Sequence, residues 1–148
     1  MIYVITCASI VMIDQLSKHL ISTNFVEGES VRLLPYLYLT YVKNVGAAFG
    51  LFANWRWVFI ILGIAVVVAA FYFRELIKRQ SWYVRWGVTL AIGGAIGNLI
   101  DRIRIGAVID FIDVTFFSIF NLADISIVAG VALLFLEVLI NDRKAASR

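Results

Sequence analysis

Four long apolar runs dominate the sequence, at residues 2–21, 57–73, 83–100 and 119–140. As a helix, each run is about long enough to cross a bilayer, which takes roughly 20 residues at about 1.5 Å per residue. Hydrophobic residues make up 62% of the chain and charged residues only 16%, with a mean hydropathy of +0.93. Because so few charges cannot coat a water-soluble domain, the sequence predicts a mainly α-helical membrane protein, built as a four-transmembrane-helix bundle.

The chain of 148 residues is expected to form a single membrane domain. Its longest polar segment, at about residues 24–56, begins with a turn and continues into β-branched and aromatic residues at 31–42. That composition favours short strands, so we expect a small β-cradle outside the membrane. The other connection on the same side, residues 101–118, is predicted to be a short loop or half-turn.

The basic residues predict how the bundle is oriented. The connection at 74–85 carries four Lys or Arg residues and the C-terminal tail carries three, all close to helix ends. Because basic residues concentrate on the cytoplasmic side of membrane proteins, we expect both termini in the cytoplasm and the β-cradle outside. The basic residues are not clustered as a nucleic-acid site requires, so no nucleic-acid partner is expected. One histidine and one cysteine cannot form a zinc-type ligand set, and no metal is expected.

With this topology, polar residues from four separate segments reach one depth near the outer membrane boundary. They are Asp14, Lys18, Asn44, Asn98, Asp101, Asp110, Asn121 and Asp124. Ionisable groups set this close to hydrocarbon are costly and usually functional. The convergence therefore predicts a site on the outer side.

Several of these residues also have purely structural interpretations. Asp14 and Lys18 are four residues apart on one helical face, so they can simply neutralise each other. Asp101 can pair with the neighbouring Arg102 at a helix end, and Asn121 can cap the fourth span. The sequence leaves these alternatives open.

Asp110 and Asp124 are the hardest acids to explain structurally, because both are framed by apolar residues. If the two carboxyl groups meet, only one ionises comfortably at neutral pH, which gives a general acid and a general base around one water molecule. Such a pair hydrolyses a peptide bond without metal or cofactor. Asp113, three residues from Asp110, can belong to the same site, but the sequence favours a solvated loop acid.

Two other classes of membrane protein compete with a hydrolase. An ion- or proton-coupled transporter also uses intramembrane Asp, Lys and Asn with helix-packing glycines, but it needs polar residues across the whole membrane depth. The inner half of the predicted bundle offers little besides Glu137. A structural adaptor gives no reason to keep Asp110 and Asp124 in apolar settings.

Five short motifs resemble those of the lipoprotein signal peptidases, the bacterial signal peptidase II family of aspartyl proteases. They are DQLSK at 14–18, NVGAAF at 44–49, GNLIDR at 97–102, VIDF at 108–111 and FNLAD at 120–124. Each motif alone is a weak signal, but all five in the family's order on a four-span scaffold form a specific one.

The resemblance implies a membrane aspartic endopeptidase of the bacterial inner membrane that acts on diacylglyceryl-modified prolipoproteins. It implies cleavage of the signal peptide just before the lipidated cysteine, on the extracytoplasmic side, with substrate and membrane lipids as partners and a monomer sufficient for activity. By motif position, the catalytic pair falls on Asp110 and Asp124. Residues that line or support the site fall on Asn44, Gly46, Ala47, Asn98, Arg102, Asn121, Ala123, Asp14, Lys18 and Asp101.

Overall fold

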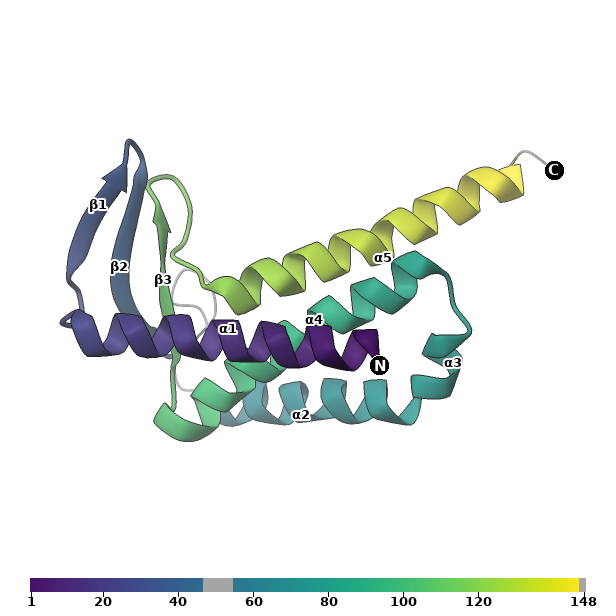
Figure 1. Ribbon diagram of the computed structural model, residues 1–148, viewed down its shortest axis with the longest axis horizontal. Helices are drawn as coiled ribbons and strands as arrows, with labels where there is room; N and C mark the ends of the chain where they lie inside the picture. Colours follow the sequence, from purple (N-terminus) through teal and green to yellow (C-terminus); the bar gives the residue numbers. More distant parts are fainter. Residues whose placement is uncertain (47–54, 147–148) are drawn as a thin grey trace.

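The computed structural model describes residues 1–46 and 55–146, which form five helices and three strands. In chain order these are α1 (Ile2–Asn24), β1 (Ser30–Leu34), β2 (Leu37–Asn44), α2 (Arg56–Tyr72), α3 (Arg74–Lys78), α4 (Trp82–Ile105), β3 (Val108–Val114) and α5 (Leu122–Ala146). Figure 1 shows the sheet at one end of the long helices, and the N-terminus and α3 at the other. The prediction of a mainly helical protein with a small sheet is confirmed.

Helix α4 lies at the centre of the bundle and contacts α1, α2 and α5. Two of its glycines make these contacts close. A Cβ atom at Gly94 would overlap the carbonyl oxygen of Ala123 in α5, and one at Gly97 would lie 2.5 Å from the Asp14 carboxylate of α1. Gly93 also packs against α1, where a Cβ atom would lie 3.1 Å from Ile10.

The distribution of side chains is inverted relative to that of a water-soluble protein. Val128 and Phe135 on α5 are 68% and 61% exposed, whereas Asp14, Lys18 and Asn121 are 0%, 2% and 0% exposed. Charged side chains are almost never fully buried in soluble proteins unless they are paired. An apolar exterior around a polar interior is the arrangement expected of helices surrounded by lipid.

Within the described part of the chain, the segments Ile2–Asn24 and Leu122–Arg143 are long and apolar enough to cross a membrane. They correspond to the first and fourth predicted spans, although the last helix begins at Leu122 rather than residue 119. The second and third predicted spans fall on α2, which is apolar but only 17 residues long, and on the 24-residue α4.

The sheet is antiparallel, with strand order β1-β2-β3. Strands β1 and β2 form a hairpin inside the predicted β-cradle, and its turn holds Tyr36 in the left-handed region at φ 67°. The prediction of a short loop over 101–118 is wrong. Helix α4 continues through Ile105 and ends at Gly106 with φ 78°, and the residues after it form β3. Asp110 is thus held in a strand.

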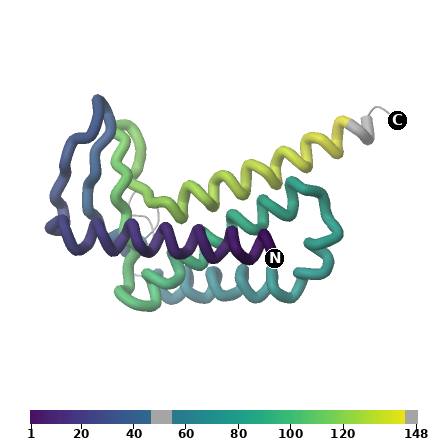
Figure 2. The backbone as a smooth tube through the Cα atoms, in the orientation of Figure 1, coloured from purple at the N-terminus to yellow at the C-terminus, as the bar shows by residue number. Residues whose placement is uncertain are grey.

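A small apolar core fixes this sheet to the end of α1. It consists of Ile21 from α1, Tyr41 from β2, and Ile109 and Phe111 from β3. After β3 the backbone turns back, and Phe120 pairs with Ile112 just before α5 begins. Figure 2 shows this return, which brings the start of α5 beside the sheet.

Candidate active site

Asp110 and Asp124 come from different elements and meet at Asn121. Asp110 lies in β3 and is 3% exposed, while Asp124 lies in the first turn of α5 and is half-buried. The side-chain amide of Asn121 donates to Asp110 Oδ1 at 2.7 Å, and its backbone N–H donates to Asp124 Oδ2 at 3.2 Å. One residue therefore contacts both carboxylates, as expected of two acids that share a site.

Asn121 is also the cap of α5. Its Oδ1 accepts from the backbone N–H of Asp124 at 2.9 Å, while the Asp124 carboxylate accepts from the Asn121 backbone. This reciprocal pair is a capping box with Asp in the third helical position. The predicted cap is confirmed, and the same geometry points the Asp124 carboxylate back toward β3.

Two amides hold the Asp110 carboxylate, one on each oxygen. Asn44 Nδ2 donates to Oδ2 at 2.9 Å, opposite the bond from Asn121 to Oδ1. Strand pairing explains the position of Asn44, because Val42 lies across from Asp110 and Asn44 two residues further along β2. The backbone N–H of Gly46 donates to Asn44 Oδ1 at 3.0 Å and fixes the orientation of the amide. Ala47, from the same motif, lies outside the described residues.

Burial raises the pKa of Asp110 to about 6. Loss of water disfavours the ionised form, and the nearby charge of Asp124 adds to the effect. The hydrogen bonds from Asn44 and Asn121 act in the opposite direction, because they stabilise the carboxylate. Asp110 therefore changes protonation close to physiological pH, which suits proton transfer.

Asn98 joins Asp124 to a buried ionic network. Its Nδ2 donates to Asp124 Oδ1 at 2.7 Å, and its Oδ1 accepts from Lys18 Nζ at 2.9 Å. Lys18 also contacts Asp14 and Asp101, at 2.8 Å each. The structural interpretation of Asp14 and Lys18 as a neutralising pair is correct, but incomplete, because the lysine holds a second carboxylate and an amide that contacts Asp124.

This network holds the backbone on both sides of the site. Asp14 Oδ1 accepts from the backbone N–H of Ala123 at 3.0 Å, and Asp101 Oδ2 accepts from that of Ile109 at 3.3 Å. Each of these N–H groups belongs to the residue just before one of the two acids. Asp14, Lys18 and Asp101 thus position Asp124 and Asp110 through the main chain.

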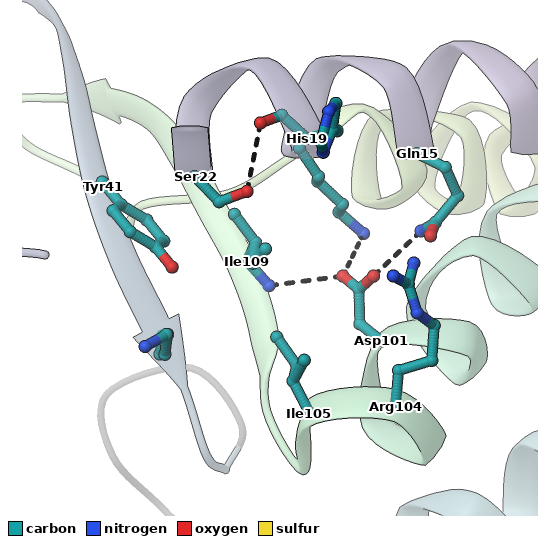
Figure 3. Close-up of a pocket in the computed structure, with 10 residues that line it drawn as sticks. Gln15, His19, Ser22, Tyr41, Asp101, Arg104, Ile105 and Ile109 are labelled. Atoms are coloured by element: carbon teal, nitrogen blue, oxygen red, sulfur yellow. Dashed lines mark hydrogen bonds and ion pairs between the residues drawn. The ribbon is translucent and has the colours of Figure 1, made fainter. Parts of the chain in front are cut away.

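Gln15 belongs to this network and was not predicted as a site residue. Its Nε2 donates to Asp101 Oδ1 at 2.9 Å and to the carbonyl oxygen of Gly97 at 3.1 Å. Figure 3 shows Asp101 accepting from Gln15 and from the backbone of Ile109. The sequence could have identified Gln15 as a site residue, because it lies inside the motif at 14–18, one residue from Asp14.

Two other expectations are corrected. Asp101 does not pair with Arg102, because a helix points neighbouring side chains in different directions. Arg102 instead lies 4.9 Å from the Phe59 ring centre and donates to the Asn98 carbonyl at 3.4 Å, close enough for its charge to act on both acids. Asp113 is no solvated loop acid, since it lies in β3 and accepts from the Thr40 hydroxyl at 2.8 Å.

An apolar groove begins at Asp124. Its volume is about 380 Å³, and it extends from Phe117 and Phe120 along α5 past Val128 to Ala132. Asp124 is the only polar residue among those that line it in the described chain. The groove therefore lies beside one of the two acids, with walls that suit an apolar ligand.

The described residues contain no group of three or more His, Cys, Asp or Glu side chains that could hold a metal ion. The polar atoms around Asp110 and Asp124 are instead amide groups, which donate to the carboxylates. Two acids held in this way, one with a raised pKa, have the groups needed for general acid–base hydrolysis.

The chain is similar to known proteins over most of its length. The family model described as signal peptidase (SPase) II matches residues 6–140. The lipoprotein signal peptidase of Desulfitobacterium hafniense is 46% identical over 142 residues, covering 95% of this chain and 94% of its own. That of Moorella thermoacetica is 42% identical over 132 residues, covering 88% of each chain.

The fold is similar to that of two solved bacterial membrane enzymes. One, determined by the in meso method at 2.3 Å resolution, superposes with a TM-score of 0.89 at 33% identity, over 95% of this chain and 88% of its own. The other, at 1.9 Å, gives a TM-score of 0.84 at 34% identity, over 93% and 92%. The matched segment includes all five motifs, so the chain belongs to the signal peptidase II family of membrane peptidases.

Proposed function

We propose that this protein removes the signal peptide from diacylglyceryl-modified prolipoproteins, cutting just before the lipidated cysteine, with Asp110 and Asp124 as the catalytic pair. The observation that carries the proposal is that Asn121 contacts both carboxylates. Family membership supports the reaction, and the family's relatives carry the name lipoprotein signal peptidase.

In this mechanism the two acids share one proton around a water molecule. The ionised carboxylate takes a proton from water as the water oxygen attacks the scissile carbonyl carbon. The protonated carboxyl group donates its proton to the carbonyl oxygen, which gives a tetrahedral gem-diol. The acid that took the water proton then passes it to the amide nitrogen, while the other carboxylate takes a proton back from a gem-diol hydroxyl. The C–N bond breaks, and the lipidated cysteine leaves as a neutral amine. Since coupled carboxylates titrate as a pair, the acid and base roles belong to Asp110 and Asp124 jointly.

The amides around the pair have separate tasks in this proposal. Asn121 and Asn44 keep the Asp110 carboxylate fixed, and Asn98 does the same for Asp124. Arg102 supplies a positive charge near both acids, which stabilises negative charge that develops on the substrate carbonyl. No metal or cofactor takes part.

The apolar groove beside Asp124 fits the lipid-rich substrate. We assign its walls, from Phe117 to Ala132, to the apolar part of the signal peptide or to the acyl chains on the substrate cysteine. A substrate that enters sideways from the bilayer reaches this groove without leaving hydrocarbon. The sheet then covers the cleavage site from the water side.

The proposed membrane arrangement has four spans, formed by α1, α2, α4 and α5. The basic connection at 74–85 supports a cytoplasmic location for that end of the bundle and for both termini. The sheet and the two acids then lie on the extracytoplasmic side of the bacterial inner membrane. Because both acids come from one chain, a monomer is sufficient for catalysis.

The direct test is hydrolysis of a diacylglyceryl-modified prolipoprotein by purified variants in detergent, followed by the mass of the released peptide. Asp110→Asn and Asp124→Asn should each lose activity by at least about a thousandfold, while their melting curves show a folded protein. Asp113→Asn is the matched control on β3 and should stay within a few-fold of the wild type. Substantial activity in either Asp110→Asn or Asp124→Asn would rule out the proposed pair.

A further inference from the structure

A second cavity lies at the end of the bundle opposite the sheet, between α1, α2, α3 and α4. Its volume is about 480 Å³, which is in the range of about 300–1,000 Å³ typical of ligand sites. The walls are mostly apolar and include Val4, Val67, Ala70 and Ile92. No acidic side chain lines it in the described part of the chain.

Three basic residues line this cavity, and they differ in their partners. Arg74 and Lys78 each contact Glu75, at 3.6 Å and 2.7 Å, with side chains 51% and 65% exposed. Arg85 makes no ion pair within the described residues. Of the three, Arg85 is therefore the one whose charge no acid of the described chain pairs with.

Arg85 also has an unsatisfied hydrogen-bond donor. Its Nε is buried and has no hydrogen-bond partner, and the guanidinium lies 5.7 Å from the Tyr3 ring centre. Buried polar groups in native proteins are nearly always hydrogen-bonded, so the protein leaves the donors of this cavity-lining guanidinium incompletely paired. An arginine prefers a planar, anionic acceptor such as phosphate or carboxylate.

We propose that this cavity binds one anionic phospholipid, with its phosphate on Arg85 and an acyl chain between the apolar walls. Arg74 and Lys78, at the cavity mouth, add long-range attraction for a headgroup with net negative charge. Basic pockets between membrane helices bind anionic headgroups for these reasons. A free phosphate ion lacks the chain that fills the apolar part, and a zwitterionic lipid lacks the net charge. The site lies at the other end of the helices from Asp110 and Asp124, so the proposal stands apart from the catalytic one.

A cysteine in the wall of the cavity makes it possible to measure whether a lipid occupies it. Cys7 is the single cysteine in the sequence and lines the cavity. The experiment measures how fast N-ethylmaleimide labels Cys7 in delipidated protein, with phosphatidylglycerol, phosphatidylcholine or inorganic phosphate added. Phosphatidylglycerol should slow labelling by on the order of tenfold, the effect of one charge-assisted contact together with chain burial. Phosphatidylcholine and inorganic phosphate should change the rate by less than about twofold.

Variants test the two halves of the site separately. Arg85→Gln should lose the protection, whereas Arg79→Gln, which removes an equal charge from an exposed position outside the cavity, should keep it. Ala70→Leu fills the apolar part and should reduce, on the order of fivefold, the phosphatidylglycerol retained in native mass spectrometry. Equal protection by phosphatidylcholine, protection by phosphate alone, or full protection in Arg85→Gln would each overturn the proposal. If Arg85→Gln does not fold, the lipid comparison and Ala70→Leu decide it.

Discussion

Replacing Lys18 with Met should destabilise this protein more than any change of a surface lysine. The Lys18 side chain is 2% exposed, and its ammonium group makes three short contacts, to Asp14 Oδ2 at 2.8 Å, Asp101 Oδ2 at 2.8 Å and Asn98 Oδ1 at 2.9 Å. Methionine has a similar length but no charge, so two buried carboxylates lose their counter-ion. Removing one partner of a buried ion pair typically costs about 3–5 kcal/mol, and we expect a loss in that range.

Lys43→Met is the matched control. Lys43 pairs with Glu27 at 2.9 Å, but the two side chains are 41% and 52% exposed. Exposed pairs contribute little to stability, so Lys43→Met should leave the free energy of unfolding nearly unchanged. Both variants remove one lysine charge from the chain, so the difference between them isolates the effect of burial.

The assay is the free energy of unfolding in mixed micelles, measured by titration with a denaturing detergent. A double-mutant cycle adds Asp101→Asn, which removes one of the two uncompensated charges. The double variant should be less destabilised than the two single variants together, with a coupling of about 0.5–3 kcal/mol. A cost for Lys18→Met no larger than for Lys43→Met, or a cycle that closes additively, would refute the reasoning.

Three further outcomes follow from the same geometry. Asn44→Ala removes a hydrogen bond that stabilises ionised Asp110, so the pKa of Asp110 should rise. The inflection near pH 6 in the pH–rate profile should then move to higher pH, whether Asp110 acts as acid or as base. An unchanged inflection would show that Asp110 does not control it. Gly94→Ala should lower the free energy of unfolding by at least about 1–3 kcal/mol, because the new Cβ atom overlaps the Ala123 carbonyl. Gly63→Ala is the control and should be tolerated, because its Cβ atom meets only a leucine side chain, at 3.2 Å. Equal melting temperatures for the two variants would contradict this. A chelator should leave peptide release unchanged, and a loss restored by added metal would count against the two-acid mechanism.

Much of the fold was accessible from sequence because lipid imposes a simple rule. A helix that crosses hydrocarbon must be apolar over about 20 residues, and α1 and α5 satisfy this directly. Residues 31–42 also indicated strands by their β-branched and aromatic content, and β1 and β2 formed there.

The strand β3 was not accessible in the same way. It pairs with β2 across about 70 residues of sequence, and Val42 and Asp110 become neighbours only after α2, α3 and α4 have returned the chain. Each of its faces carries apolar residues together with one aspartate, Asp110 or Asp113, so it lacks the alternation that identifies a half-buried strand. Pairing, and not local pattern, defines this element.

The candidate site was partly predictable for a physical reason. Burying a carboxylate or an amide in an apolar run costs free energy, so Asp110, Asp124 and Asn121 could each be identified from the sequence as candidate site residues. The direction of a side chain was harder to predict. A contact between Asp101 and its neighbour Arg102 was one open alternative, but in the structure Asp101 faces Lys18 on another helix. The contacts of Gln15 likewise depend on the packing of α1 against α4.

The central claim is that Asp110 and Asp124 act as one unit, and the most direct measurement compares single and double variants. The rate of signal-peptide release from a diacylglyceryl-modified prolipoprotein is measured for Asp110→Asn, Asp124→Asn and the variant that carries both. Residues that act together lose nearly all their contribution when either is removed, so the double variant should be no slower than the slower single variant. Losses that multiply in the double variant would show two independent groups and contradict the account.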